Sequence, residues 1–238
     1  MKIDVLTLFP EVVSVMQNYG VLGRALQNGL VEMRTVCIRD FSEDRHHRVD
    51  DTVYGGAAGM LMGPQPVVDA IDSVRDPQAR VIYLSPQGPV LTQQKARALA
   101  SEEHLVLLCG HYEGIDARVT NHFIDEELSI GDYVLTGGEL PAMVLIDAVL
   151  RWVKGVLGNE ASAASDSHVD GLLQYDEYTK PRNFRGYTVP EILLNGNHAE
   201  IAAWRRQSAL ENTKKKRPDL YEKYNADQAS EGGKNGLY

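Results

Sequence analysis

The sequence predicts an α/β protein, with a parallel sheet in its first two-thirds and a small, mostly helical part at its C-terminal end. Short apolar runs of β-type residues alternate with segments of helical period, the pattern of a sheet covered on both faces. After Gly155 the chain turns to small and polar residues. With 238 residues, 43% of them hydrophobic and 24% charged, the chain is long and apolar enough to bury a core.

Near-continuous apolar runs mark the expected strands, because a strand buried on both faces carries few polar residues. These runs lie at residues 3–9, 31–38, 80–84 and 104–109. Helical spacing of apolar residues marks the expected helices, the last of which has Pro141 in its first turn. These helices span residues 65–74, 92–100 and 140–153.

The C-terminal part is predicted to form a separate unit. Residues 158–169 are mostly small and polar and have no apolar period, so we expect a flexible linker there. Residues 187–194 and 199–210, with the Lys-rich stretch that follows, are expected to be mostly helical, and residues 226–238 to fray. The predicted divisions are 1–157, 158–169 and 170–238.

Charge is distributed unevenly along the chain. In total, 24 Lys and Arg residues face 33 Asp and Glu residues, a net charge of -9 that argues against a simple basic nucleic-acid binder. Residues 204–217 nevertheless hold Arg205, Arg206, Lys214, Lys215, Lys216 and Arg217 against Glu211 alone. This basic stretch indicates either a solvated helix end or a set of phosphate contacts.

Cysteine usage and hydropathy indicate a reducing compartment. Cys37 and Cys109 each lie in an apolar stretch without metal-ligand spacing, so we interpret both as small core residues. The chain begins with Met1-Lys2-Ile3-Asp4, and no apolar run approaches the roughly 20 residues that span a bilayer. We therefore expect a cytoplasmic protein without a membrane partner. The adjacent His46 and His47 would lie on opposite faces of a strand, so no metal site is predicted there.

Glycine clusters follow the predicted strands at residues 84–88, 109–114 and 129–139. One such cluster is ordinary turn chemistry, but three in series favour a common pocket at the carboxyl edge of the sheet, where open α/β sheets bind ligands. The chain has neither GxGxxG nor GxxxxGK[ST], so neither a dinucleotide fingerprint nor a P-loop is predicted.

These motifs resemble those of the bacterial tRNA (guanine-N1)-methyltransferases, and the likeness covers nearly the whole chain. It rests above all on Tyr-Leu-Ser-Pro-Gln-Gly at 83–88, Gly-His-Tyr-Glu-Gly at 110–114, the run 130–141, Glu-Ala-Ser at 160–162 and Gly-Asn-His at 196–198. The resemblance implies a parallel α/β sheet whose C-terminal part forms a deep trefoil knot, followed by a linker and a small helical tRNA-binding domain. It also implies a homodimer with active sites at the subunit interface, which methylates the guanosine immediately 3′ of the anticodon, position 37.

The cofactor implied by the resemblance is S-adenosylmethionine, bound by the loops of the knot. Glycines in these loops would let backbone groups approach the adenine and the methionine tail. The implied cofactor residues are Tyr83, Leu84, Ser85, Pro86, Gly110, Ile130, Gly131, Asp132, Tyr133, Val134, Leu135, Gly137, Gly138 and Pro141. Mg²⁺ is compatible with the acidic clusters, but these show no ligand spacing and no metal ligand is assigned.

Methylation at guanine N1 requires a base, because that nitrogen carries a proton, and the negative charge then spreads onto O6. The resemblance implies Asp166 as the base, Arg151 as the group that stabilises O6, and Glu113 as a residue that orients the reacting groups. Without the resemblance, Asp166 is one polar linker residue, Arg151 a cation at a helix end and Glu113 an exposed turn carboxylate.

The implied substrate contacts involve both parts of the chain, with no DNA partner. They are Arg45, Asp50, Tyr54, His198, Arg205, Lys214 and Lys215. Aromatic and Arg side chains suit splayed RNA bases, although Trp204 fits a helix core equally well. Two alternatives remain: a catalytically silent RNA-binding or assembly module, and a knotted methyltransferase of ribosomal RNA. His111 departs from those members that carry Arg there, since a neutral imidazole has no permanent charge.

Overall fold

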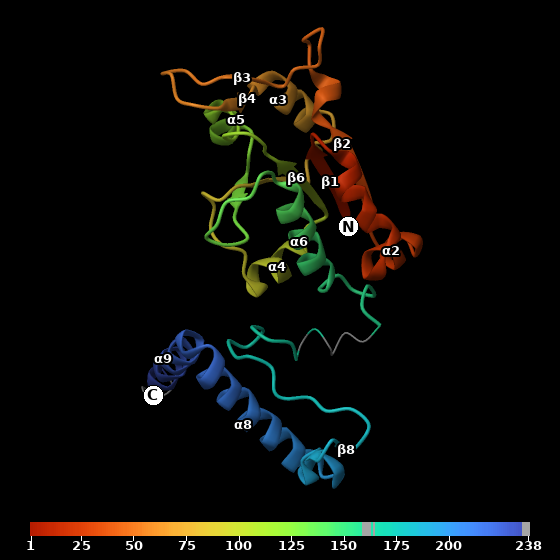
Figure 1. The fold of residues 1–238 in the computed structure, drawn as a ribbon, viewed down its shortest axis with the longest axis vertical. Coiled ribbons are helices and arrows are strands. Elements are labelled where there is room, and N and C mark those ends of the chain that lie inside the picture. Colours follow the sequence, from red (N-terminus) through yellow and green to blue (C-terminus); the bar gives the residue numbers. More distant parts are fainter. Residues whose placement is uncertain (159–162, 164, 235–238) are drawn as a thin grey trace. The chain divides into compact units, whose positions relative to one another are not determined.

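The computed structural model describes residues 1–158, 163 and 165–234, and it divides into two units, Met1–Glu160 and Ala161–Tyr238 (Figure 1). The first unit contains a five-stranded sheet in the order β2-β1-β6-β5-β7, with every neighbouring pair parallel. Its strands are β1 (Lys2–Thr7), β2 (Glu32–Cys37), β5 (Ala79–Leu84), β6 (His104–Cys109) and β7 (Glu126–Leu128). The predicted parallel α/β sheet is confirmed, and β7 is an addition to it.

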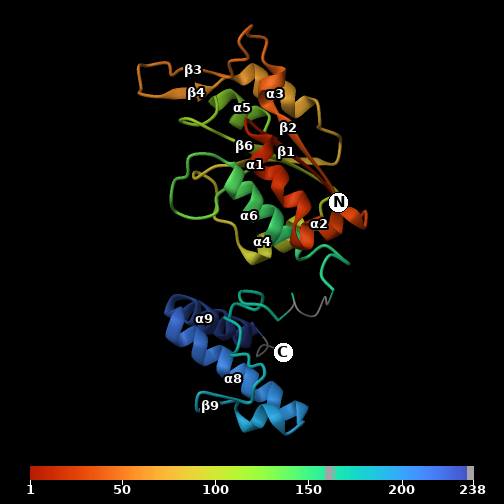
Figure 2. The same cartoon turned by 45° about the vertical axis from the view of Figure 1, so that its right-hand side comes forward.

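Helices cover both faces of this sheet. Successive side chains of β1 point to opposite faces, so Ile3 and Val5 join one core cluster and Leu6 joins the other. The first cluster packs against α1 (Pro10–Ser14), α2 (Gly20–Gln27), α4 (Gln93–Leu99) and α6 (Glu139–Leu150). The second packs against α3 (Pro64–Asp72) and α5 (Ala117–His122) (Figure 2).

The helix starts follow from local chemistry. The Thr92 side chain accepts a hydrogen bond of 3.1 Å from the Lys95 amide and caps α4, and a proline stands in the first turn of α3. The helix predicted over 140–153 corresponds to α6, which ends at Leu150. Trp152 and Val153 follow it in turns, where their amides donate to carbonyls three residues back. No helix among the described residues is long and apolar enough to cross a membrane.

The segment before a second, two-stranded sheet contradicts the prediction that His46 and His47 lie in a strand. β3 (Asp50–Thr52) and β4 (Met60–Met62) pair antiparallel, and His46 and His47 precede them in a turn rather than in a strand. The Asp44 carboxylate accepts from the His46 amide at 2.8 Å, and His47 has a φ of 53°. An Asp side chain that bonds the backbone two residues on favours such a turn over a strand.

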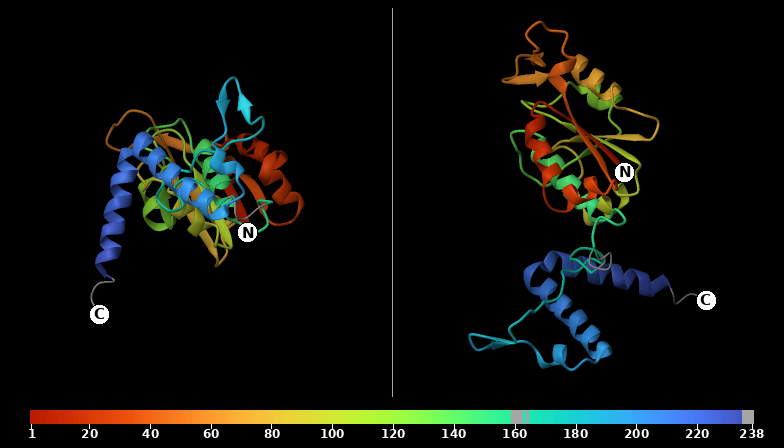
Figure 3. Two further views of the ribbon diagram at one scale, coloured as in Figure 1. Left: turned by 90° about the horizontal axis from the view of Figure 1, so that it is seen from below. Right: turned by 90° about the vertical axis from the view of Figure 1, so that its right-hand side faces the viewer.

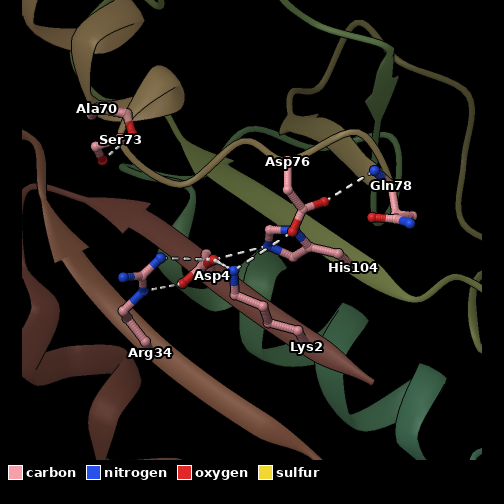
Figure 4. Close-up of polar contacts among 8 residues, drawn as sticks. All are labelled: Lys2, Asp4, Arg34, Ala70, Ser73, Asp76, Gln78 and His104. Carbon is pink, nitrogen blue, oxygen red and sulfur yellow. Dashed lines mark hydrogen bonds and ion pairs between the residues drawn. The ribbon is translucent and has the colours of Figure 1, made fainter.

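Five charged and titratable side chains form an ionic network at the amino ends of β1, β2 and β6 (Figure 4). Asp4 is fully buried and lies between the guanidinium of Arg34 and Nε2 of His104, the latter 2.8 Å away. His104 Nδ1 lies 2.8 Å from Asp76, and Lys2 Nζ lies 3.4 Å from Asp4. Burial acts to raise the pKa of Asp4, but the hydrogen bonds from Arg34 and His104 outweigh it and lower that pKa.

The second unit is built around α8 (His198–Lys216) and α9 (Pro218–Lys234). α8 ends at Lys216 because Pro218 cannot continue it. α9 begins at Pro218 and runs at a sharp angle to α8 (Figure 3). Before α8, β8 (Asn183–Phe184) pairs with β9 (Tyr187–Thr188), and a 3-10 turn, η3, spans Glu191–Leu194. The helix predicted over 187–194 is therefore a two-residue strand followed by a 3-10 helix over its last four residues. The tail predicted to fray is helical through Lys234, and residues 235–238 lie outside the described part.

The segment that follows the predicted linker is hydrogen-bonded to α8. Two buried hydroxyls of α8 accept backbone hydrogen bonds: Thr213 from the Leu173 amide at 2.9 Å and Ser208 from the Asp176 amide at 3.0 Å. The His168 amide donates to the Leu172 carbonyl at 2.7 Å and closes a turn. The prediction of flexibility for residues 159–162 and 164 falls outside the described residues.

Candidate active site

A cavity of about 310 Å³ lies at the carboxyl ends of β5, β6 and β7. Its walls are the loops after β5 and β6 and the loop between β7 and α6. Every cofactor residue implied by the resemblance lines it except Asp132, which stands between the lining residues Gly131 and Tyr133. The sequence prediction did not include His111, Glu127 and Thr136, which also line the cavity. His111 lies inside a glycine cluster, and that position is the one signal that could have identified it.

Glycine is required where the cavity loops approach one another. A Cβ atom at Gly138 would lie 2.6 Å from Cα of Cys109, and one at Gly110 would lie 2.8 Å from the ring of Tyr83. The Gly138 amide donates to the Gly110 carbonyl at 3.0 Å. Backbone of one loop therefore lies directly on backbone of the other, and the glycines that predicted a pocket are needed to form it.

Two titratable groups at the cavity are held neutral. Burial, and secondarily the negative charge of Glu127, raises the pKa of Tyr83 to about 12. Burial, and secondarily the charge of Glu139, raises the pKa of the Cys109 thiol well above its usual value. Tyr83 therefore offers a neutral hydroxyl to a ligand, and the buried Cys109 behaves as a small core residue.

Glu113 lies at the rim of the cavity and is positioned from the second sheet. Its amide donates to the Met60 carbonyl in β4 at 2.9 Å. Its side chain lies over Gly59, which has a φ of +92°, and a Cβ atom there would lie 2.4 Å from Cγ of Glu113. The glycine-rich stretch before β4 thus supports a carboxylate more than fifty residues away, a contact without local sequence signal.

The two other predicted catalytic residues belong to different units. Arg151 is the C-terminal cap of α6 in the first unit and is half-buried. Asp166 belongs to the second unit, also half-buried, in the turn that precedes the segment bonded to α8. It lines a cavity of about 300 Å³ together with Tyr175, Arg205 and Arg206.

The predicted substrate residues lie in both units, and all of them are exposed except Asp50, which is half-buried. Arg45, Asp50 and Tyr54 lie in and before the β3–β4 hairpin, and the Tyr54 side chain is 98% exposed. His198 is the first residue of α8, and Lys214 and Lys215 lie in its last turn, beyond Arg205. The guanidinium of Arg205 lies 4.9 Å from the ring centre of Tyr175.

The surroundings of Trp204 favour neither an RNA contact nor a place in the helix core, the two roles that the sequence allows. It is half-buried, and its ring lies 6.2 Å from that of Tyr178. Among the residues that the structure describes, no three His, Cys, Asp or Glu side chains gather in a group that could hold a metal ion.

A glycine-walled cavity at the carboxyl edge of a parallel sheet defines an α/β ligand-binding protein. The chain belongs to the family described as tRNA (Guanine-1)-methyltransferase TrmD, whose model matches residues 1–223. It is 56% identical over 224 residues to the tRNA (guanine-N(1)-)-methyltransferase of Finegoldia magna, covering 94% of this chain and 96% of that protein. It is 50% identical over 232 residues to the protein of the same name from Staphylococcus aureus strain MRSA252, covering 96% and 95%.

Proposed function

We propose that this protein transfers a methyl group from S-adenosylmethionine to N1 of the guanosine immediately 3′ of the anticodon, position 37, in tRNA. The observation that carries the proposal is the glycine-walled cavity, lined by nearly all the implied cofactor residues, in a chain matched to the family over residues 1–223. The names of the relatives support the same reaction and substrate.

The size and the lining of the cavity support binding of the methyl donor there. Its volume of about 310 Å³ falls in the range of small-molecule sites, about 300 to 1,000 Å³. Leu84, Ile130 and Leu135 offer apolar walls, while the glycine loops offer backbone donors and acceptors. When bound there, S-adenosylmethionine supplies an electrophilic methyl group on a sulfonium.

The protein side of the reaction is a proton transfer and a charge stabilisation. Asp166 accepts the N1 proton of guanine, and Arg151 donates hydrogen bonds to O6 as negative charge develops there. Glu113, fixed over Gly59 at the cavity rim, orients the reacting groups. Exclusion of water strengthens each of these interactions when substrate is bound.

The cavity loops support a further proposal about the fold, that the chain through residues 83–141 is threaded as a deep trefoil knot. Supporting it, the chain at Gly138 passes directly against Cys109 and Gly110 at the end of β6. The isolated bridge between His111 and Gly137 joins the same two segments.

An exposed apolar face supports a homodimer with active sites at the subunit interface. Phe9, Val12 and Val15 from α1 and its flank, with Leu140 and Val144 from α6, are large exposed apolar side chains on two helices that contact each other. A contiguous apolar face of this kind marks an interaction site, and a second copy of the chain would cover it. Arg151 follows Leu140 by eleven residues, three helical turns, and so lies on the same face of α6.

A charge placed in this face is expected to separate the dimer. In the Val144→Asp variant, sedimentation velocity should give the mass of one chain, 26.4 kDa, and methylation should fall together with the dimer. Val90→Asp, at an equally exposed apolar residue outside the face, should stay dimeric. A wild-type monomer, or a dimeric Val144→Asp variant, would contradict the proposed interface.

The basic stretch of α8 is expected to contact phosphates. The double variant Lys214→Ala with Lys215→Ala should bind tRNA more weakly, and the slope of log affinity against log salt should become shallower by about 1 to 2. Arg24→Ala, exposed on α2 of the first unit, provides the control. An unchanged slope would indicate that Lys214 and Lys215 form a solvated helix end and do not contact phosphates.

Single-turnover methylation of an anticodon stem-loop tests the reaction itself. A stem-loop with guanosine at position 37 should be methylated at N1, and one with adenosine there should not. Absence of methyl transfer by the wild-type chain to any tRNA would contradict the proposed function.

A further inference from the structure

Thr7, His111 and Glu139 form a hydrogen-bonded group beside the cavity. Glu139 is 6% exposed and is the first residue of α6. Its carboxylate accepts from the Thr7 hydroxyl, and His111 Nε2 lies 2.8 and 2.9 Å from its two oxygens. The resemblance assigned no role to any of the three. Three separate elements meet at this carboxylate: the end of β1, the loop after β6 and the start of α6.

The hydrogen bonds around Glu139 suit a carboxylate that accepts from neighbours on two other elements. Thr7 Oγ1 accepts the Phe9 amide at 2.9 Å, so its own hydrogen is directed to Glu139. Carboxylate oxygens accept hydrogen bonds, so Glu139 pairs with the His111 tautomer that has its proton on Nε2. The amino end of α6 favours a negative charge at this position. The contacts of Nε2 with both Glu139 oxygens fix the orientation of the His111 ring.

The Glu139–His111 contact joins the two loops that wall the cavity. His111 belongs to the loop after β6, with Gly110 and Glu113, and Glu139 directly follows the wall residues Gly137 and Gly138. The packing leaves no free space: a Cβ atom at Gly137 would lie 2.4 Å from Cε1 of His111 and 2.6 Å from Oε2 of Glu139. Any change in this contact must alter the separation of the two loops.

Aromatic packing holds the other side of the ring. The Phe9 ring lies 5.0 Å from the imidazole of His111, edge to face. Because Phe9 follows Thr7 closely along the chain, the same segment supports both members of the pair. His111 is thus confined by Glu139 on one side and by Phe9 on another, at the wall of the cavity.

We propose that Glu139 is a positioning residue for the methyl-donor cavity, acting through His111, and that this pair sets the spacing of the two glycine loops and hence the affinity for the donor. The inference rests on the proposed function, because it takes the cavity as the donor site.

Calorimetric titration with S-adenosylhomocysteine, without tRNA, tests the proposal. Glu139→Gln and His111→Leu should each weaken binding about tenfold, and the double variant should bind no more weakly than the worse single variant, because both remove one interaction. His111→Arg should stay within about threefold of wild type, since a guanidinium still donates to Glu139. At saturating substrates kcat should change less than about threefold in every variant, so that the loss appears in Kd and KM.

The controls separate positioning from general stability. Glu32→Gln and His122→Gln change the same residue types at exposed sites and should bind as wild type. If Glu139→Gln does not fold, Thr7→Val removes one donor to Glu139 and should still weaken binding. Wild-type affinity in both single variants, or losses that add in the double variant, would overturn the proposal. A wild-type chain that does not bind S-adenosylhomocysteine would overturn the proposed function as well, whereas binding without tRNA methylation would overturn only the function.

Discussion

Replacing Asp166 by Asn is expected to lower the single-turnover methylation rate by about 10² to 10⁴, the usual contribution of a general base. The amide has the size of the carboxylate but cannot accept the N1 proton. Affinity for S-adenosylhomocysteine should not change, because the residues that line the donor cavity belong to the first unit and Asp166 to the second. Rapid-quench assays with the stem-loop, together with calorimetry on the same samples, give both quantities.

Asp227→Asn provides the matched control for this experiment. Asp227 is an exposed carboxylate in α9 of the same unit, so its replacement should leave the rate as in wild type. If the rate of Asp166→Asn stays within about threefold of wild type, Asp166 is not the general base. Asp→Asn losses of equal size at both positions would indicate a general effect on the second unit.

Replacing Asp4 by Asn is expected to destabilise the first unit by about 1 to 3 kcal/mol, the cost of leaving a buried hydrogen-bonding site incompletely paired, because the remaining cation Arg34 is half exposed. Arg34 and His104 would then lose their buried counter-charge. Because the pKa of Asp4 is lowered in the folded chain, its contribution is complete above the unfolded value, near pH 4. It is lost as the pH falls through the lowered folded pKa.

Urea unfolding at a series of pH values measures both effects. Wild type should lose stability more steeply below about pH 4 than Asp4→Asn, which has no carboxylate to protonate. Asp72→Asn, an exposed carboxylate in α3, should change stability by less than about 0.5 kcal/mol. Parallel pH curves for wild type and Asp4→Asn would show that the network does not stabilise the fold.

The central strands of the sheet could be predicted because each is apolar on both faces. β6 reads His-Leu-Val-Leu-Leu-Cys, all buried, and its predicted bounds are confirmed. β7 was not predicted, since it contributes only Glu-Glu-Leu, and its first residue, Glu126, pairs with the cations Arg80 and Lys95. Short edge strands of this kind depend on tertiary partners that periodicity does not reveal.

The site could be predicted where the signal is local and not where it depends on distant contacts. The glycine clusters indicated the cavity because glycine is needed wherever two loops approach closely. The Glu139–Thr7 bond joins residues 132 positions apart, and His104 reaches Asp4 across 100 positions. Neither pair has a spacing that a sequence pattern can display, so buried polar partners of this kind required the structure.

The strand order also determines when the sheet can form as the chain is synthesised. β5 pairs only with β6 and β7, and β6 supplies the one connection between β5 and the β1–β2 pair. Lys2 pairs with His104, so about 100 residues must follow β1 before its second neighbour exists. At about 5 to 20 residues per second this takes about 5 to 20 seconds, during which the edge of β1 that β6 later covers is unpaired. Until β6 emerges, β5 therefore cannot be joined to the β1–β2 pair in one sheet.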